Sequence, residues 1–234
     1  MILEENKCLN CTKRKNSLFK DLSNDELKTL GNNKYSVFYK SGEVICKAGT
    51  KPLGLICLNK GKVKIVRRGL NGSNQIVGLK KAVDFLGFKA LMSDRTCLSS
   101  AIALEDSAVC IIKQENFFNT IESNKDLAFK IMKLFAHNLM KSDSRLINLT
   151  QKHIRGRLAE ALLLINDVFG TNQKTGDLNL YLKRSDLAGL SNMTTANAIR
   201  VLGSFKKEKL VEVNKQSIKI TNLNVLKEIS VFDK

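Results

Sequence analysis

The chain has 234 residues, enough for one or two domains, and its 43% hydrophobic content argues against wholesale disorder. The formal net charge of +17 favours a polyanionic partner, either nucleic acid or an anionic membrane surface. No apolar run has the length of a membrane span, and the acidic N-terminus lacks the apolar core of a signal peptide. We therefore expect a cytoplasmic protein without a membrane partner, whose six cysteines are thiols or metal ligands.

The N-terminal segment contains a C-x-x-C pair, Cys8 and Cys11, in a basic and polar context. One such pair without a second can bind a metal but is weak evidence that it does. Further along, Ser23 and Glu26 have the spacing of a capping box, which predicts a short helix after Ser23.

From Tyr35 to about Ile112 the sequence changes to short apolar runs separated by glycines. Many short strands at even spacing predict an all-β barrel, roll or sandwich, and Asn71-Gly72 is the strongest hairpin turn among them. The predicted strands are Tyr35–Tyr39, Val44–Lys47, Leu53–Leu58, Lys62–Arg67, Gln75–Leu79, Ser100–Leu104 and Ala108–Ile112.

After Asn116 the apolar spacing becomes helical, first around Phe117 to Ile121 and then from about Asn124 to Leu149. The longer helix has an apolar stripe of Leu127, Ile131, Leu134, Phe135, Leu139, Leu146 and Leu149. A helix of this length cannot bury the whole stripe against one small domain, so we expect part of it to pair with a second copy in a two-fold dimer. A further helix, Arg155 to Phe169, is expected to end at Gly170.

The segment from Leu182 to Ile220 has the pattern of a winged helix-turn-helix. We expect Ser185 to cap a first helix, Ser191-Asn192 to form the turn, and Thr194 to cap a second helix. The apolar face of the second helix is expected to be Ala198, Val201, Leu202 and Phe205. Two alternating runs, Leu210 to Val213 and Ser217 to Ile220, flank the polar Asn214-Lys215-Gln216 and predict a hairpin, the wing.

The exposed side of the second helix is free of acidic residues, which favours DNA over the alternative of a small core with a solvated basic face. The residues expected to contact DNA are Ser185, Thr194, Thr195, Asn197, Arg200, Ser204, Lys206 and Lys207.

Several segments together resemble the CRP/FNR family of bacterial transcription regulators. They are Lys40 to Gly49, Asn59 to Val63, Asp84 to Gly87, Arg155 to Ala159 and the helix-turn-helix from Ser185 to Leu202. The resemblance implies an α+β fold with an N-terminal double-stranded β-roll sensor domain at 1–122, a long central dimerisation helix at 123–152 and a C-terminal winged helix-turn-helix at 153–234. It also implies a homodimer whose recognition helices enter the major groove of double-stranded DNA, with RNA polymerase as a further partner.

The resemblance also assigns an effector pocket, at Gly87, Phe88, Ser99 and Ser100. Members that bind cyclic AMP have a glutamate where this chain has Phe88 and an arginine where it has Ser99. A buried cyclic phosphate needs a cation and hydrogen-bond donors, so we expect no cyclic AMP binding.

Oxygen-sensing members hold a [4Fe–4S] cluster with C-x-x-C-x5-C and a later cysteine. Cys8, Cys11 and Cys110 match three of these positions, but the remaining position is Ser17. Clusters strongly prefer thiolates, so we predict no cofactor and leave open a vestigial motif, a redox pair, or zinc bound with outside help. Cys46, Cys57 and Cys97 are interpreted as small core residues.

No nucleophile elbow, P-loop or pair of catalytic carboxylates is recognisable, so the sequence does not indicate an enzyme. We predict a dimeric, sequence-specific DNA-binding regulator whose β-roll senses an unidentified effector or redox signal. The alternative is a small-molecule binding module that acts on a protein partner. That alternative leaves Arg200 without a role.

The well-known members have Arg-Glu where this chain has Thr195 and Ala196, so their DNA half-site should not be assumed here.

Overall fold

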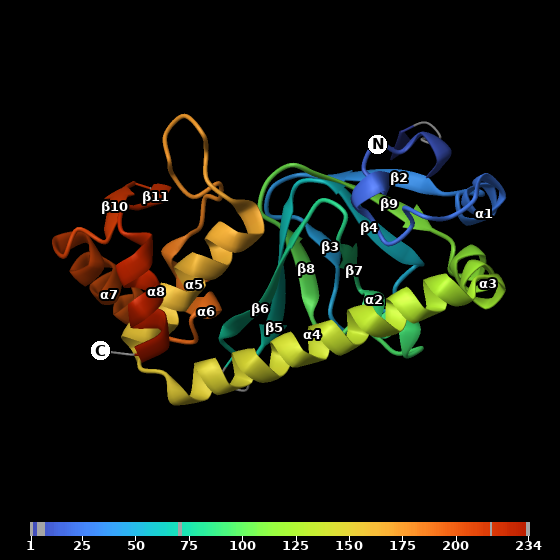
Figure 1. Cartoon of the computed structure of the whole chain (residues 1–234). Coiled ribbons are helices and arrows are strands. Elements are labelled where there is room, and N and C mark those ends of the chain that lie inside the picture. The colour runs from blue at the N-terminus through green and yellow to red at the C-terminus, as the bar shows by residue number, and fades with distance from the viewer. Residues whose placement is uncertain (1, 4–7, 70–71, 216, 233–234) are drawn as a thin grey trace. The chain divides into compact units, whose positions relative to one another are not determined.

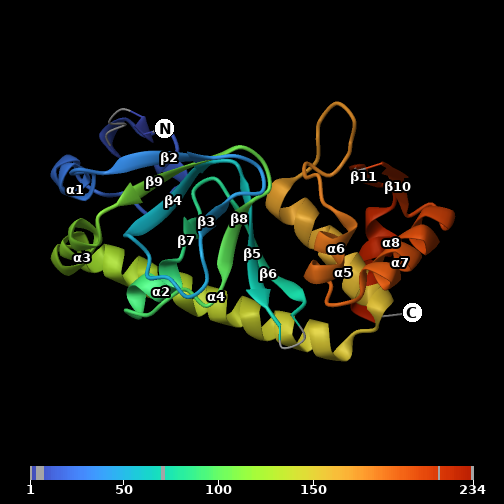
Figure 2. The same ribbon diagram turned by 180° about the vertical axis from the view of Figure 1, so that it is seen from behind.

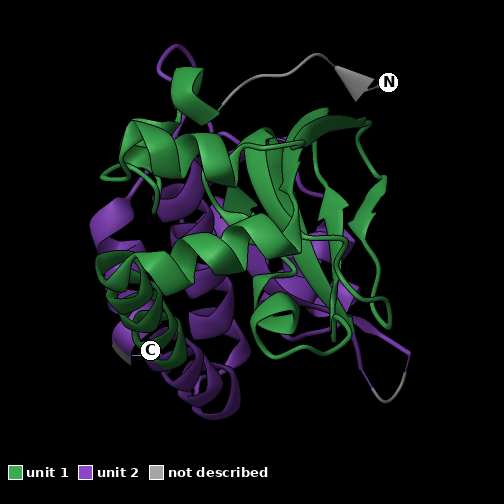
Figure 3. Ribbon diagram, turned by 90° about the vertical axis from the view of Figure 1, so that its right-hand side faces the viewer, with its two compact units in different colours: residues 1–67, 80–139 green, residues 68–79, 140–234 purple. Residues whose placement is uncertain are grey.

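The computed structural model describes residues 2–3, 8–69, 72–215 and 217–232 (Figure 1 and Figure 2). They form two compact units, one of residues 1–67 and 80–139 and the other of residues 68–79 and 140–234 (Figure 3). The unit boundary therefore falls inside the long helix, whereas the predicted domains ended at residues 122 and 152. Asn71 of the predicted hairpin turn and Gln216 of the predicted wing lie outside the described residues.

Two antiparallel sheets contain the strands that precede α3 (Gln114–Ser123) in the sequence. One has the strand order β1-β2-β9-β4-β7 and the other has the order β3-β8-β5-β6. The first comprises Ile2–Leu3, Tyr35–Tyr39, Ser107–Ile112, Leu55–Lys60 and Phe85–Leu86, and the second Val44–Cys46, Ser100–Ala103, Lys62–Arg68 and Asn74–Lys81. Alternating side chains of both sheets, among them Leu58, Val63, Ala101 and Val109, meet in one core. All seven predicted strands are confirmed to within two residues at either end.

Four helices accompany these sheets: α1 (Asn24–Leu30), α2 (Phe88–Met92), α3 (Gln114–Ser123) and the first part of α4 (Lys125–Gln151). A second core of the unit is aromatic. Phe88 is buried there and stacks on Phe135 of α4, with ring centroids 5.1 Å apart and planes inclined by 10°. Phe117 of α3 lies edge-on to Phe88 at 6.0 Å, within the range in which aromatic pairs attract.

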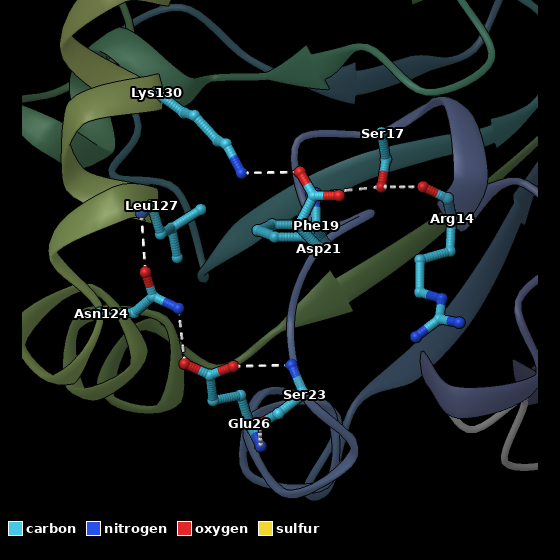
Figure 4. Close-up of polar contacts among 9 residues, drawn as sticks. All are labelled: Arg14, Ser17, Phe19, Asp21, Ser23, Glu26, Asn124, Leu127 and Lys130. Carbon is cyan, nitrogen blue, oxygen red and sulfur yellow. Dashed lines mark hydrogen bonds and ion pairs between the residues drawn. The ribbon is translucent and has the colours of Figure 1, made fainter.

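The predicted capping box of α1 is confirmed, and it also connects α1 to α4 (Figure 4). The Ser23 backbone N–H donates to Glu26 Oε2 at 2.7 Å, while the Glu26 N–H donates to Ser23 Oγ at 3.3 Å. The other carboxylate oxygen of Glu26 accepts from Asn124 Nδ2 at 2.6 Å, and Asn124 Oδ1 accepts from the Leu127 N–H at 2.8 Å. Glu26 therefore helps to cap α1 and orients Asn124, which caps α4.

The long helix α4 has two apolar faces rather than the single predicted stripe. Leu127 and Ile131 are buried in the first unit, whereas Leu139 and Leu146 are more than 60% exposed. The other strongly exposed apolar side chains of this helix are Phe129, Met132, Met140 and Ile147. No helix in the described part of the chain combines the length and apolarity that crossing a bilayer requires.

The second unit contains the winged helix-turn-helix, and the α+β fold class is confirmed. Its helices are α5 (Ile154–Phe169), α6 (Arg184–Leu190), α7 (Thr195–Lys207) and α8 (Leu223–Phe232), and its hairpin consists of β10 (Val211–Asn214) and β11 (Ser217–Ile220). Gly170 ends α5 with a φ of 68°, as predicted. Helix α8, which packs against α5, was not predicted.

We expect Glu26→Ala to lower the free energy of unfolding by about 1–2 kcal/mol, because it removes the cap interactions of two helices. Hydrogen bonds from Asn124 and Ser23 hold the pKa of Glu26 below its usual range. The stabilisation should therefore be present above the unfolded-state pKa of about 4.3 and be lost as the pH falls through the lower folded-state pKa.

Urea unfolding of the wild type and of Glu26→Ala at several pH values measures this difference in stability. The neighbouring Asp25→Ala is the control, because Asp25 only pairs with exposed Lys28. An equal loss in both variants would contradict the role of Glu26.

Candidate nucleic-acid interface and cysteine cavity

The turn between α6 and α7 depends on Asn192, as predicted. Asn192 has a φ of 50°, in the left-handed region that asparagine tolerates better than most residues. The buried Ser191 hydroxyl donates to the Leu187 carbonyl at 2.7 Å and satisfies the end of α6. Arg157 Nη1 of α5 donates to the Asn192 carbonyl at 2.8 Å, which holds the turn in its bend. The prediction that Ser185 caps α6 is wrong, because the helix begins at Arg184 and its cap position is Lys183.

Helix α7 has the predicted cap and the predicted buried face. Thr194 Oγ1 accepts from the Asn197 N–H at 3.2 Å. The inward side chains Ala198, Val201, Leu202 and Phe205 are all at most 5% exposed. The side chains of Thr195, Arg200, Lys206 and Lys207 are exposed, and Asn197 is half-buried. The helix contains no acidic residue, so its outer face presents positive charge and hydrogen-bond donors.

Ser204 and the end of α7 belong to an interaction network inside the unit. Arg155 of α5 forms a two-bond ion pair with Glu208, and its guanidinium lies 4.9 Å from the centre of the Phe205 ring. Ser204 Oγ accepts from Arg155 Nη1 at 3.2 Å and donates to Glu208 Oε1 at 2.7 Å. These bonds lower the pKa of Glu208, chiefly through Arg155 and then Ser204. The predicted DNA-contacting hydroxyl of Ser204 is therefore engaged in orienting α7 on α5.

The wing is a four-pair hairpin that runs from the Val211–Ile220 pair to the Asn214–Ser217 pair. Arg184 Nη2 at the start of α6 donates to the Lys215 carbonyl at 3.2 Å, so the wing turn is tied to the helix-turn-helix. At the base of the hairpin, Thr221 Oγ1 donates to the Lys209 carbonyl at 2.6 Å. Helix α7 and the wing are thus held as one element.

In the first unit, four cysteines line a single cavity: Cys8, Cys11, Cys57 and Cys110. The cavity wall also includes Ser17 and Lys34. Cys57 was predicted to be a core residue, and it packs partly buried against the second core of the unit as well as lining this cavity. Its strand β4 pairs with β9 so that Cys57 lies directly opposite Cys110, and cross-strand neighbours project from the same face of a sheet.

The thiols of this cavity do not lie together as a metal site. No group of three or more Cys, His, Asp or Glu side chains among the described residues is close enough to hold a metal ion. Burial raises the pKa of the Cys8 and Cys57 thiols, and the nearby charge of Lys34 opposes that shift. Cys46 and Cys97 lie outside this cavity, buried in the β core with their sulfur atoms 2.9 Å apart.

The residues of the predicted effector pocket do not line this cysteine cavity. Gly87 adopts a φ of 66° at the N-cap position before α2, and an added Cβ would lie 3.4 Å from the Cys97 sulfur. Phe88 is only 7% exposed and packs in the aromatic core. Ser99 is half-buried, and Ser100 Oγ accepts from the Ala48 N–H at 3.0 Å.

Comparison with known proteins agrees with this architecture. The sequence profile of the cyclic nucleotide-binding domain matches residues 36–124, and that of the Crp-like helix-turn-helix domain matches residues 156–229. The fumarate and nitrate reduction regulatory protein of Vibrio cholerae is 27% identical over 196 residues, which cover 83% of this chain and 78% of that protein. Electron transport regulator A of Shewanella oneidensis is 28% identical over 191 residues, which cover 80% of this chain and 76% of that protein.

Solved structures have the same fold. FixK2 from Bradyrhizobium japonicum has a TM-score of 0.73 at 20% identity and covers 84% of this chain and 96% of its own. A transcriptional regulator of the CRP/FNR family from Thermus thermophilus has a TM-score of 0.70 at 19% identity, with coverages of 83% and 97%. With both profiles matched in order and a winged helix-turn-helix present, the chain belongs to the CRP/FNR family of DNA-binding transcription regulators.

Proposed function

We propose that the protein is a cytosolic homodimer that reads a specific DNA sequence with α7 and responds to a signal received by its β-sheet unit. RNA polymerase is the further partner that a transcription regulator requires. The single observation that carries the proposal is the outer face of α7, which is exposed and basic, beside a wing that Arg184 of α6 ties to the helix-turn-helix.

Base reading is assigned to Arg200. Its guanidinium is exposed on α7, and an arginine fork can donate two hydrogen bonds to guanine O6 and N7. Thr195 and Asn197 flank the same face nearer the N-terminus of the helix, where recognition helices contact base edges. Lys206 and Lys207 lie in the last turn and suit contacts to phosphates, which position a protein without specifying sequence.

Dimerisation is assigned to the exposed apolar face of α4. Met132, Leu139 and Leu146 are spaced by seven residues, the repeat that keeps one seam facing a partner helix. All three are more than half exposed, and contiguous exposed apolar surface of this kind marks an interaction site. A second copy of the same helix supplies a matching seam, and two-fold pairing would present two copies of α7 to successive major grooves, about 34 Å apart.

The alternative function is a small-molecule binding module that acts on a protein partner. The cyclic nucleotide-binding profile favours it for the β-sheet unit, although Phe88 lies in the core instead of a pocket. In that case Arg200 and the wing would have no role. If the wild-type protein shows no sequence-specific DNA binding in the selection experiment described below, this alternative is favoured.

Substitution of Arg200 tests base reading. Arg200→Ala should cost about 1–3 kcal/mol of binding to the preferred site and relax the preference at one base pair of each half-site, because a bidentate contact is lost. Lys206→Ala is the matched control. It should weaken binding about equally on all sequences and reduce the slope of log affinity against log salt by about 1. Selection from a randomised duplex library measures both. If Arg200→Ala retains the wild-type sequence preference, α7 does not read bases through Arg200.

Substitution of the α4 seam tests dimerisation. Leu139→Glu combined with Leu146→Glu should yield monomers, because carboxylates would be buried in an apolar seam without partners. Ile131 is unsuitable for this test, since it is buried in the core of the first unit. Lys141→Glu, an exposed charge reversal two residues beyond Leu139, is the control and should remain dimeric. Sedimentation velocity distinguishes the states, and a wild type that is monomeric at micromolar concentration would refute the assignment.

A further inference from the structure

We propose that Ile199 of α7 contacts the C5-methyl group of a pyrimidine in the major groove, so that the protein distinguishes thymine or 5-methylcytosine from an unmethylated pyrimidine. This inference rests on the proposed function and deepens it, because it names a chemical group that α7 recognises beside the base read by Arg200. Ile199 differs from the other side chains assigned to the interface in that it can neither donate nor accept a hydrogen bond.

The side chain of Ile199 lies on the outer surface of α7. It is 52% exposed, whereas the adjacent Ala198 is fully buried. Ala196 and Thr195 precede Ile199 by three and four residues, and residues at these spacings are neighbours on a helix surface. Both are exposed, as is Arg200, which follows Ile199 directly. Ile199 therefore belongs to the same solvent-facing surface as the residues predicted to contact DNA.

The surface of α7 on either side of Ile199 is shallow. Toward the N-terminus of the helix, its neighbour Ala196 has only a methyl group as a side chain. Toward the C-terminus, Gly203 has no side chain, and a Cβ added there would meet no atom within 4 Å. Ile199 is thus the prominent apolar group between two small residues, and these leave room for a base edge to approach the helix.

The exposure of Ile199 is better explained by a partner than by folding. About half of its apolar surface remains in water, where it contributes little to the stability of the unit. Its branched Cβ also makes isoleucine a weaker helix former than alanine or leucine. Single exposed apolar side chains are common on proteins, but this one lies on the basic, acid-free helix that is assigned to DNA. An apolar group presented by DNA would bury it.

The major groove offers one apolar group of this kind. Every base edge there presents hydrogen-bond donors or acceptors, and among the four standard bases only thymine adds a methyl group, at C5. The base 5-methylcytosine carries a methyl group on the same carbon. Against unmethylated cytosine, Ile199 would displace water from a polar base edge without making an apolar contact in return. The contact therefore discriminates between methylated and unmethylated pyrimidines.

The remaining side chains of α7 agree with a methyl contact. Cytosine is typically recognised by a carboxylate that accepts a hydrogen bond from its N4 amino group, and α7 contains neither Asp nor Glu. The methyl groups of Thr195 and Ala196 also suit a thymine methyl and extend the apolar surface of Ile199. Arg200, next in the sequence, would then read a guanine close to the methylated pyrimidine.

The test is a binding titration of the full chain on synthetic duplexes that carry the site selected by the wild type. Each thymine of the half-site is replaced in turn by deoxyuridine, which pairs identically and lacks only the methyl group. At one position of each half-site, deoxyuridine should weaken binding by about 4-fold, the equivalent of about 0.8 kcal/mol for one buried methyl group. At that same position, 5-methylcytosine should bind about 4-fold more tightly than cytosine. The tighter of the thymine and 5-methylcytosine duplexes identifies the preferred source of the methyl group.

Variants assign the contact to Ile199. Ile199→Ala should give the thymine and deoxyuridine duplexes equal affinity, because the alanine side chain is too short to reach the methyl group. Alanine favours the helix, so this variant should fold. Val231→Ala is the matched control. Val231 is a branched apolar side chain that is 66% exposed on α8, and its truncation should leave the 4-fold difference unchanged.

Two results would overturn the proposal. One is a wild type that binds the thymine and deoxyuridine duplexes equally at every position of the half-site. The other is a preference for thymine that persists undiminished in Ile199→Ala, because a different residue would then read the methyl group. A wild type that selects a specific site but ignores the methyl group contradicts this inference alone. A wild type without sequence-specific binding contradicts the proposed function, and this inference fails with it.

Discussion

The structure depends on one constraint, the two-faced apolar character of α4. The start of this 27-residue helix is held in the first unit by Leu127 and Ile131, and by Asn124 at its cap. Further along, its apolar side chains are exposed to water, a state that costs free energy until a partner covers them. Because the unit boundary falls between Leu139 and Met140, one continuous helix contributes to both units. A change that alters its pairing would therefore reach both the β-sheet unit and the DNA-binding unit, which is how we account for the proposed regulation.

Features governed by local chemistry could be predicted from the sequence. The capping box of Ser23 and Glu26, the left-handed Asn192 and the cap at Thr194 each depend on residues within a few positions of one another. The strands of the first unit were also found, because alternation and glycine punctuation are local patterns. The same holds for the buried face of α7, which follows from helical spacing alone.

Features governed by pairing between distant segments could not be predicted in this way. The sequence around Cys57 indicates an apolar strand residue. Its place on the cysteine cavity depends on the register of β4 with β9, which sets Cys57 opposite Cys110. Phe88 occupies a position that suggested a ligand pocket, but stacking on Phe135 of α4 draws it into the core. The sequence predicted a single apolar stripe on α4. In the structure Leu127 and Ile131 of that stripe are buried in the first unit, whereas Leu139 and Leu146 are exposed. Ser204 donates to Glu208, which lies just beyond α7. The sequence does not indicate this contact, because Arg155 of the distant helix α5 holds Glu208 in place.

The most direct test of the central claim is selection of binding sites by the wild-type full chain from a randomised duplex library, with the salt concentration held fixed. A dimer that presents two copies of α7 should enrich a two-fold symmetric site whose half-sites are centred about 10–10.5 base pairs apart, one helical turn. Recovery of sequences with no symmetric element, or no enrichment above non-specific binding, would contradict the account.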